Sequence, residues 1–77
     1  MAYVISVTKD NVNYCVRAEE SIGQFVLIPV ESDSDLTKIF CHPHRIGAVQ
    51  ILNWINDNQP SLACEELKVR DEAAFRK

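Results

Sequence analysis

The stretch from His42 to Pro60 constrains the fold most, because only there do apolar residues recur with the period of a helix. Pro43 suits the first turn of a helix, since its fixed φ is already helical and its missing N–H needs no partner there. Cys41 or His42 then becomes the N-cap residue. At the other end, poor helix formers from Asn56 lead to Pro60, which cannot continue the helix. The sequence therefore predicts one central helix.

This helix has an apolar face and a polar face. At about 100° per residue, one set of apolar side chains lines up on a single side. The predicted core-facing residues are Ala48, Ile51, Leu52 and Ile55, with His44 at the N-terminal end. The predicted solvent-facing residues are Gln50, Asn53 and Asp57.

Three apolar residues do not fit this simple division. Val49 and Trp54 flank the apolar stripe, and Ile46 points to the polar side. In the plainer interpretation the stripe is wide and is covered by a loop or by the C-terminal residues. In the functional interpretation Trp54 or Ile46 anchors a partner, because half-exposed aromatic residues are common anchors of interfaces.

The residues before the helix indicate β-strands. Apolar residues alternate with polar ones in two runs, which is typical of half-buried strands. Lys9-Asp10-Asn11 separates the runs and suits a tight turn. The runs therefore predict a β-hairpin whose buried face carries Tyr3, Ile5, Val7, Val12, Tyr14 and Val16.

Two further segments precede the helix. Residues 24–30 are almost entirely apolar and predict an inner strand covered on both faces. Pro29 restricts this strand, because it has no N–H to donate and belongs at an edge, a bulge or a strand end. Residues 36–40 predict a short strand, with a turn of helix capped by Asp33 or Ser34 as the alternative.

After the helix, the alternation returns. Residues 64–71 predict a final strand at a sheet edge, with Leu67 and Val69 on one face and charged residues on the other. A helix from Ser61 is the alternative, since several residues there are good helix formers. The order predicts a single α+β domain over residues 1–71 and a tail over 72–77. Its sheet is antiparallel, with four to five strands and one helix packed on one face.

One helix cannot cover both faces of such a sheet. The second face carries Val4, Cys15 and part of the strand over residues 24–30, so it is apolar enough to need a cover. We therefore expect a homodimer formed through that face or through an edge strand.

Composition excludes several classes of protein. A chain of 77 residues with a net charge of −3 has room for one core and is poorly suited to nucleic acid. Contact with nucleic acid through Arg70, Arg76 and Lys77 is the third option. The apolar run that ends at Pro29, residues 25–28, is far too short to span a membrane. Three widely spaced cysteines and the lack of a signal peptide at the N-terminus indicate a cytoplasmic protein.

Reactive side chains gather only at Cys41, His42 and His44. Thiolate and imidazole are zinc ligands, so this turn is the candidate metal site. In the plainer interpretation Cys41 is a small buried apolar residue, His44 packs on the apolar face of the helix and His42 is an exposed cap. The two glycines, Gly23 and Gly47, form no phosphate-binding loop, and we expect neither catalysis nor a cofactor.

The sequence thus predicts a small non-enzymatic protein-binding module that acts as a homodimer. Its partner is a protein of unknown identity, and neither a membrane nor nucleic acid is expected to bind. The alternative is a metal-binding protein that uses the Cys41-His42-x-His44 turn. The residues expected to contact a partner are Ile46, Val49, Trp54, Leu67 and Val69.

Overall fold

The structure is a computed structural model and describes residues 2–75. Its strands are β1 (Tyr3–Lys9), β2 (Val12–Glu19), β3 (Gln24–Pro29) and β4 (Lys68–Asp71). Its helices are α1 (Arg45–Asn58) and the short α2 (Pro60–Ala63), with 3-10 turns η1 (Asp33–Thr37) and η2 (Glu72–Phe75). The predicted fold class is confirmed: one antiparallel sheet carries one main helix.

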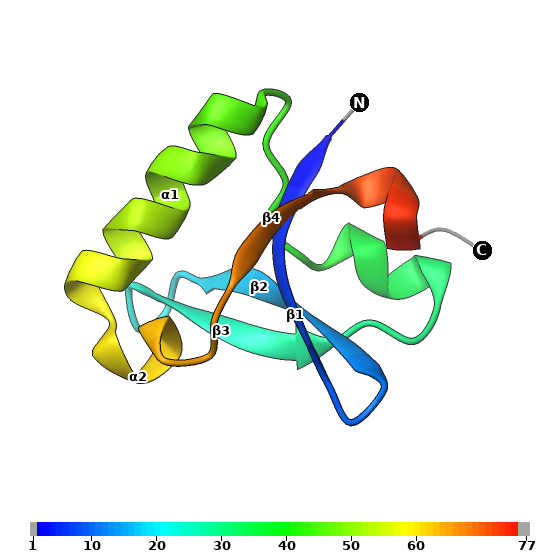
Figure 1. Cartoon of the computed structure of the whole chain (residues 1–77), viewed down its shortest axis with the longest axis horizontal. Helices are drawn as coiled ribbons and strands as arrows, with labels where there is room; N and C mark the ends of the chain where they lie inside the picture. The colour runs from blue at the N-terminus through cyan, green and yellow to red at the C-terminus, as the bar shows by residue number, and fades with distance from the viewer. Residues whose placement is uncertain (1, 76–77) are drawn as a thin grey trace.

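The strands lie in the order β3-β2-β1-β4, and every neighbouring pair is antiparallel. Helix α1 lies on one side of this sheet, and the turns η1 and η2 lie on the other (Figure 1). β3 and β4 are the two edges, as the topology requires.

The hairpin of β1 and β2 is confirmed. Lys9 faces Val12 across a two-residue turn, and both turn residues are left-handed, with φ of 53° at Asp10 and 65° at Asn11. Such turns favour Asn and Asp, and their twist matches that of the strands they join. The turn therefore fixes which residues of β1 and β2 share a face.

Helix α1 begins two residues later than Pro43, which was the predicted start. Its N-cap is His44, in an extended conformation, and the helix starts at Arg45. The predicted faces are confirmed, since Ala48 and Ile55 are fully buried and the predicted solvent-facing residues are exposed. The apolar stripe therefore predicted correctly which side of the helix packs on the sheet, whereas the proline did not mark its first residue.

β3 was predicted as an inner strand, and that prediction is wrong, because β3 pairs only with β2. The first N–H and carbonyl that β3 points away from β2, those of Phe25, form hydrogen bonds with a side chain instead of with another strand. Gln59 Oε1 accepts from the Phe25 N–H at 2.8 Å, and Gln59 Nε2 donates to the Phe25 carbonyl at 2.9 Å. Pro29 also faces outward, where its lack of an N–H costs nothing.

The short strand preferred over residues 36–40 is also wrong. η1 is a 3-10 turn that starts after Ser32, and the Asp35 carboxylate accepts from the backbone N–H groups of Glu31 and Ser32. This reciprocal capping stabilises a helical turn. The helical alternative was closer, although its cap is Ser32 and not Asp33 or Ser34.

The segment after α1 contains both predicted alternatives. α2 forms a short helical turn at Pro60–Ala63, and β4 pairs with β1 from Lys68 to Asp71. The edge position predicted for the last strand is confirmed. Glu66, with φ of 60°, lies in the connection between them.

Both faces of the sheet are covered by the chain itself. On the α1 side, Ile5, Val16 and Ile55 form a fully buried cluster. On the other side, a second cluster joins the sheet to the η1 and η2 turns, and its buried members are Val4, Cys15, Val30, Leu36, Ile39 and Phe75. The second face therefore has its cover, and the reason given for a homodimer is lost there. Phe75, predicted to lie in a tail, belongs to this core; residues 76–77 lie outside the described chain.

The chain around Phe40 separates the central strands at one end. β1 and β2 pair only as far as Ser6 and Cys15. Beyond that point the Phe40 N–H donates to the Val16 carbonyl, and His42 exchanges two backbone hydrogen bonds with Tyr3. This insertion brings Phe40 and His42 against the N-terminal half of α1.

Candidate functional site

Trp54 is a large, partly exposed apolar side chain on the surface beside β3. It is 43% exposed, and the edge of its ring meets Phe25, with 5.8 Å between ring centroids and 69° between ring planes. Phe25 in turn contacts Phe40 at 5.9 Å and 84°. Such edge-to-face pairs favour a fixed geometry, so the indole is held in place from below.

A shallow hollow lies beside Trp54. It has a volume of about 280 Å³, and its walls are mostly apolar. The residues that line it are Ala18, Glu19, Glu20, Gly23, Gln24, Phe25 and Trp54. Gly23 has a left-handed φ of 63°, and a methyl group built on it would meet no atom within 4 Å, so the hollow is open at that point.

The rim of this hollow is acidic. Glu19 is paired with Arg17 and accepts a hydrogen bond from the Ser21 hydroxyl. The Glu20 carboxylate is exposed and has no side-chain partner among residues 2–75. We name the hollow together with Trp54 and Phe25 the Trp54 surface.

The other residues expected to bind a partner do not join the Trp54 surface. Ile46 is 71% exposed, but it lies eight residues earlier on α1, about 12 Å along the helix axis. Val49 is half-buried. Leu67 and Val69 pack against the α1 side of the core, near the opposite edge of the sheet.

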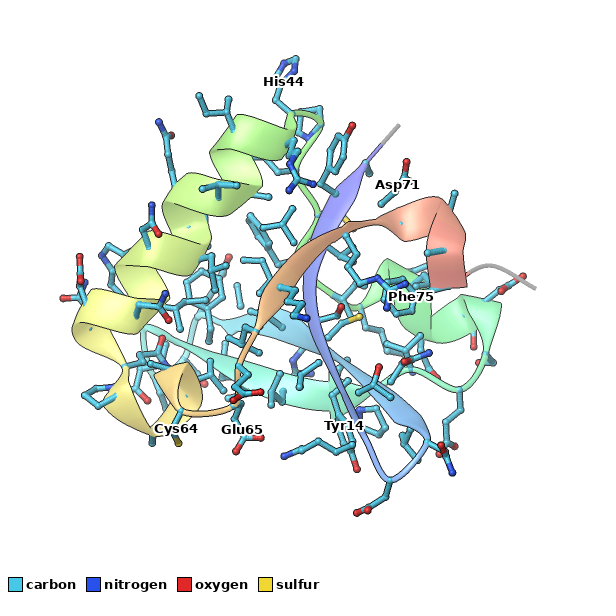
Figure 2. The ribbon with its side chains drawn as sticks, in the orientation of Figure 1. Tyr14, His44, Cys64, Glu65, Asp71 and Phe75 are labelled. Carbon is cyan, nitrogen blue, oxygen red and sulfur yellow. The ribbon has the colours of Figure 1, made fainter. Side chains whose placement is uncertain are left out.

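The reactive turn at Cys41 has a different arrangement from the one expected. The His42 ring lies against Gly47, while the exposed His44 side chain points away from the molecule (Figure 2). His42, and not His44, therefore packs against the helix, and the expectation that His44 lies on its apolar face is wrong. Cys41 is exposed rather than buried, and its thiol donates to Glu72 at 3.3 Å.

The His42 ring acts as the cap that His44 does not provide. The His44 N–H donates to His42 Nδ1 at 3.0 Å, and the same Nδ1 lies 3.0 Å from the His44 carbonyl oxygen. This side-chain bond supplies one of the acceptors that the start of a helix needs. Within residues 2–75, no group of three or more His, Cys, Asp or Glu residues is arranged to hold a metal ion.

The remaining two cysteines differ in burial. Cys15 is fully buried, and burial raises the pKa of its thiol to about 12, a rise to which neighbouring Cys41 adds and which Arg70 opposes. Cys64 is exposed, and its thiol donates to the Ser61 carbonyl at 3.1 Å. Cys64 and Glu65 follow α2, at the end of the molecule opposite His44 (Figure 2).

Several important residues were missed from the sequence. Phe25 was assigned to an inner strand, and Gln59 was read only as part of the helix stop. Gly47 was noted only as unsuited to a phosphate loop. The His42 ring lies close to Gly47, five residues later, across the start of the helix. In the sequence, the glycine is the one feature that indicates such a close approach.

Comparison with protein-family models gives no match, and comparisons with curated proteins and with solved structures give no significant similarity. Among residues 2–75, no helix combines the length and apolar character needed to cross a membrane.

Proposed function

We propose that this chain is a non-enzymatic protein-binding module whose partner inserts an apolar side chain beside Trp54. The observation that carries this proposal is a half-exposed indole held on Phe25 at the edge of an apolar hollow. Fixed aromatic residues beside a hollow are typical of the few positions that supply most of the binding energy in interfaces.

The charge around the hollow supports a partner of a particular kind. The rim carries the exposed Glu20 carboxylate beside Glu19, which is paired with Arg17, and the chain has a net charge of −3. A partner segment with an apolar side chain flanked by lysine or arginine would complement this rim. A second copy of this chain would place acidic rim against acidic rim at this surface, so a different protein is the better-supported partner.

Site-directed photo-crosslinking in an extract of the source organism tests the proposal. A photoreactive residue replaces Gln24, which lines the hollow, and a matched control replaces Gln50, which is exposed on α1. We expect one discrete adduct from position 24 and none from position 50. An adduct with twice the mass of the chain would identify a homodimer and contradict the choice of partner.

Variants of the hollow make the same test specific. Ala18→Arg fills the hollow from an exposed position of β2, and Trp54→Ala removes the anchor. We expect both to abolish the adduct from position 24 while the circular dichroism spectrum stays native. An undiminished adduct in both variants would refute the proposal.

The metal-binding alternative stays a prediction. The Cys41 thiol donates to Glu72, and the His42 ring accepts from the His44 backbone N–H. No observation therefore favours metal binding as a second function. Native mass spectrometry with and without zinc tests it, with Cys41→Ser as the variant that must lose any adduct.

A further inference from the structure

The two edges of the sheet are protected differently. On β3, Gln59 occupies the backbone of Phe25, and Pro29 has no N–H to offer. Among residues 2–75, no side chain bonds to the outward backbone groups of β4 in this way. Exposed strand edges are the places where another strand can be added.

The register shows which groups of β4 face outward. Glu72 N–H donates to the Ala2 carbonyl, and Arg70 and Lys68 follow at alternate positions opposite Val4 and Ser6. Because hydrogen bonding alternates along an antiparallel strand, Val69 must point its N–H and carbonyl away from β1. Neither group has a hydrogen-bond partner in the part of the chain that the structure describes.

The two faces of β4 differ in chemistry. Val69 packs on the α1 side with Leu67, whereas Lys68 and Arg70 lie on the other face. Neither cation is paired with a carboxylate within residues 2–75, although Arg70 also lies over the Phe75 ring at 5.4 Å. Three other cations, Lys9, Arg17 and Lys38, do have carboxylate partners.

Space for a side chain exists beside these two cations. A hollow of about 220 Å³ lies where β4 separates from β1. Its lining residues are Ser6, Val7, Thr8, Glu66, Lys68 and Arg70. Glu66 is the one carboxylate there, so cations outnumber anions in this hollow.

We propose that the open edge of β4 binds an extended segment of another protein in which apolar and acidic residues alternate. Val69 supplies backbone hydrogen bonds to the added strand, Leu67 and Val69 meet its apolar side chains, and Lys68 and Arg70 meet its acidic ones. Addition of a strand at a sheet edge is an established mode of peptide recognition. This site is separate from the Trp54 surface and goes beyond the function proposed above.

A second copy of this chain is a poor occupant of this edge. Two β4 strands paired antiparallel would place the Lys68 and Arg70 of one copy across from those of the other. Like charges directly opposite each other destabilise paired strands. The charges therefore reject the identical strand and favour an acidic one.

Nuclear magnetic resonance titration of the full chain with short peptides tests the proposal. One peptide alternates valine and glutamate, and its control alternates valine and lysine. We expect the glutamate peptide to shift the Val69 amide signal and to slow its hydrogen exchange, with the lysine peptide bound about tenfold more weakly or not at all. Equal binding of the two peptides would refute the charge argument.

Two controls separate strand addition from simple charge attraction. Two forms of the glutamate peptide carry N-methyl groups on alternate residues, one form on the odd and the other on the even positions. Both keep the charge of the parent peptide, but one of them loses the N–H groups that would face β4. If both methylated forms bind as well as the parent, no strand is added. The double variant Lys68→Glu/Arg70→Glu should reverse the preference and take the lysine peptide, while a native spectrum verifies its fold.

The Trp54→Ala variant distinguishes this inference from the proposed function. Because β4 and the Trp54 surface lie at different edges of the sheet, we expect Trp54→Ala to leave the peptide affinity unchanged. A loss of affinity in that variant would show that the peptide binds at the Trp54 surface and would overturn the assignment to β4.

Discussion

The side-chain amide of Gln59 pairs with both backbone groups of Phe25, at 2.8 and 2.9 Å, and so takes the place of a neighbouring strand. Gln59 is only 7% exposed although it is polar. It joins the end of α1 to the start of β3, which also positions Phe25 beneath Trp54. The proposed protein-binding surface thus depends on a residue outside it.

Gln59→Leu is expected to lower the free energy of unfolding by about 1–3 kcal/mol, because two backbone groups of Phe25 lose their partners. Gln50→Leu, an exposed change of the same type on α1, is the matched control and should change it by less than about 0.5 kcal/mol. Urea unfolding followed by Trp54 fluorescence measures both. Equal effects of the two changes would show that the Gln59 bonds contribute no net stability.

Gly47→Ala is expected to destabilise the chain by about 1–3 kcal/mol, since its new methyl group would lie 2.0–2.4 Å from His42 ring atoms. In a His42→Ala background the same change removes a helical glycine without a clash and should stabilise by about 0.5–1 kcal/mol. Thermal unfolding of the four chains of this double-mutant cycle provides the measurement. The prediction fails if Gly47→Ala has the same sign in both backgrounds.

The Asp35 carboxylate should make the free energy of unfolding depend on pH in the acid range. Hydrogen bonds from the backbone N–H groups of Glu31, first, and Ser32, together with Lys38, lower the pKa of its carboxyl below the ordinary 3.8. The charged form is therefore favoured by folding, so its contribution is present above about pH 4 and is lost as pH falls through the lowered pKa. Asp35→Asn should consequently unfold more easily than the parent at pH 6 and lose that difference near pH 2. A difference that is the same at both pH values would contradict this origin.

The three thiols should react at different rates. Cys41 and Cys64 are exposed, whereas Cys15 is fully buried and burial raises its pKa to about 12. At pH 8 we expect iodoacetamide to modify two thiols of the folded chain and the third only on unfolding. Mass spectrometry with peptide mapping identifies the sites, and Cys15→Ser provides the control with no slow phase.

The same thiol gives a prediction in alkali. Because the folded chain holds the Cys15 proton more tightly than the unfolded chain, its contribution to stability is complete below pH 9 and declines between about pH 9 and 12. Cys15→Ala should weaken this alkaline decline. Urea unfolding at pH 8 and pH 10 compares the parent with the variant, and identical declines would exclude Cys15 as the cause.

The sequence predicted the fold where local chemistry and burial agree. The hairpin followed from alternation and from a turn that accepts left-handed residues, and the core side of α1 followed from its apolar stripe. β3 was misplaced because an edge strand that is covered by a distant side chain, Gln59, and by helix α1 has the same apolar sequence as an inner strand. Residues 36–40 were misread as a strand, because the Asp35 cap favours a 3-10 turn over Asp33–Thr37.

The candidate site was only partly accessible from the sequence. Trp54 was recognised because it is an aromatic residue that flanks the apolar stripe of α1. Its hollow was not, since Ala18 and Gly23 come from β2 and from the turn after it, far from Trp54 along the chain. The packing of His42, and not His44, against the helix depended on a 3.0 Å hydrogen bond and on space above Gly47, which no periodic pattern encodes.

The insertion of Phe40 and His42 between the central strands also sets an order of assembly. The β1–β2 hairpin can close on its own from its turn only as far as Ser6 and Cys15. The Val16 carbonyl and the backbone groups of Tyr3 form their hydrogen bonds only once residues 40–42 are present, and Val4 pairs with Arg70 of β4. During synthesis the first strand can therefore complete its pairing only after residues 68–71 have been made. Such dependence on distant contacts makes closure of the sheet the slow step.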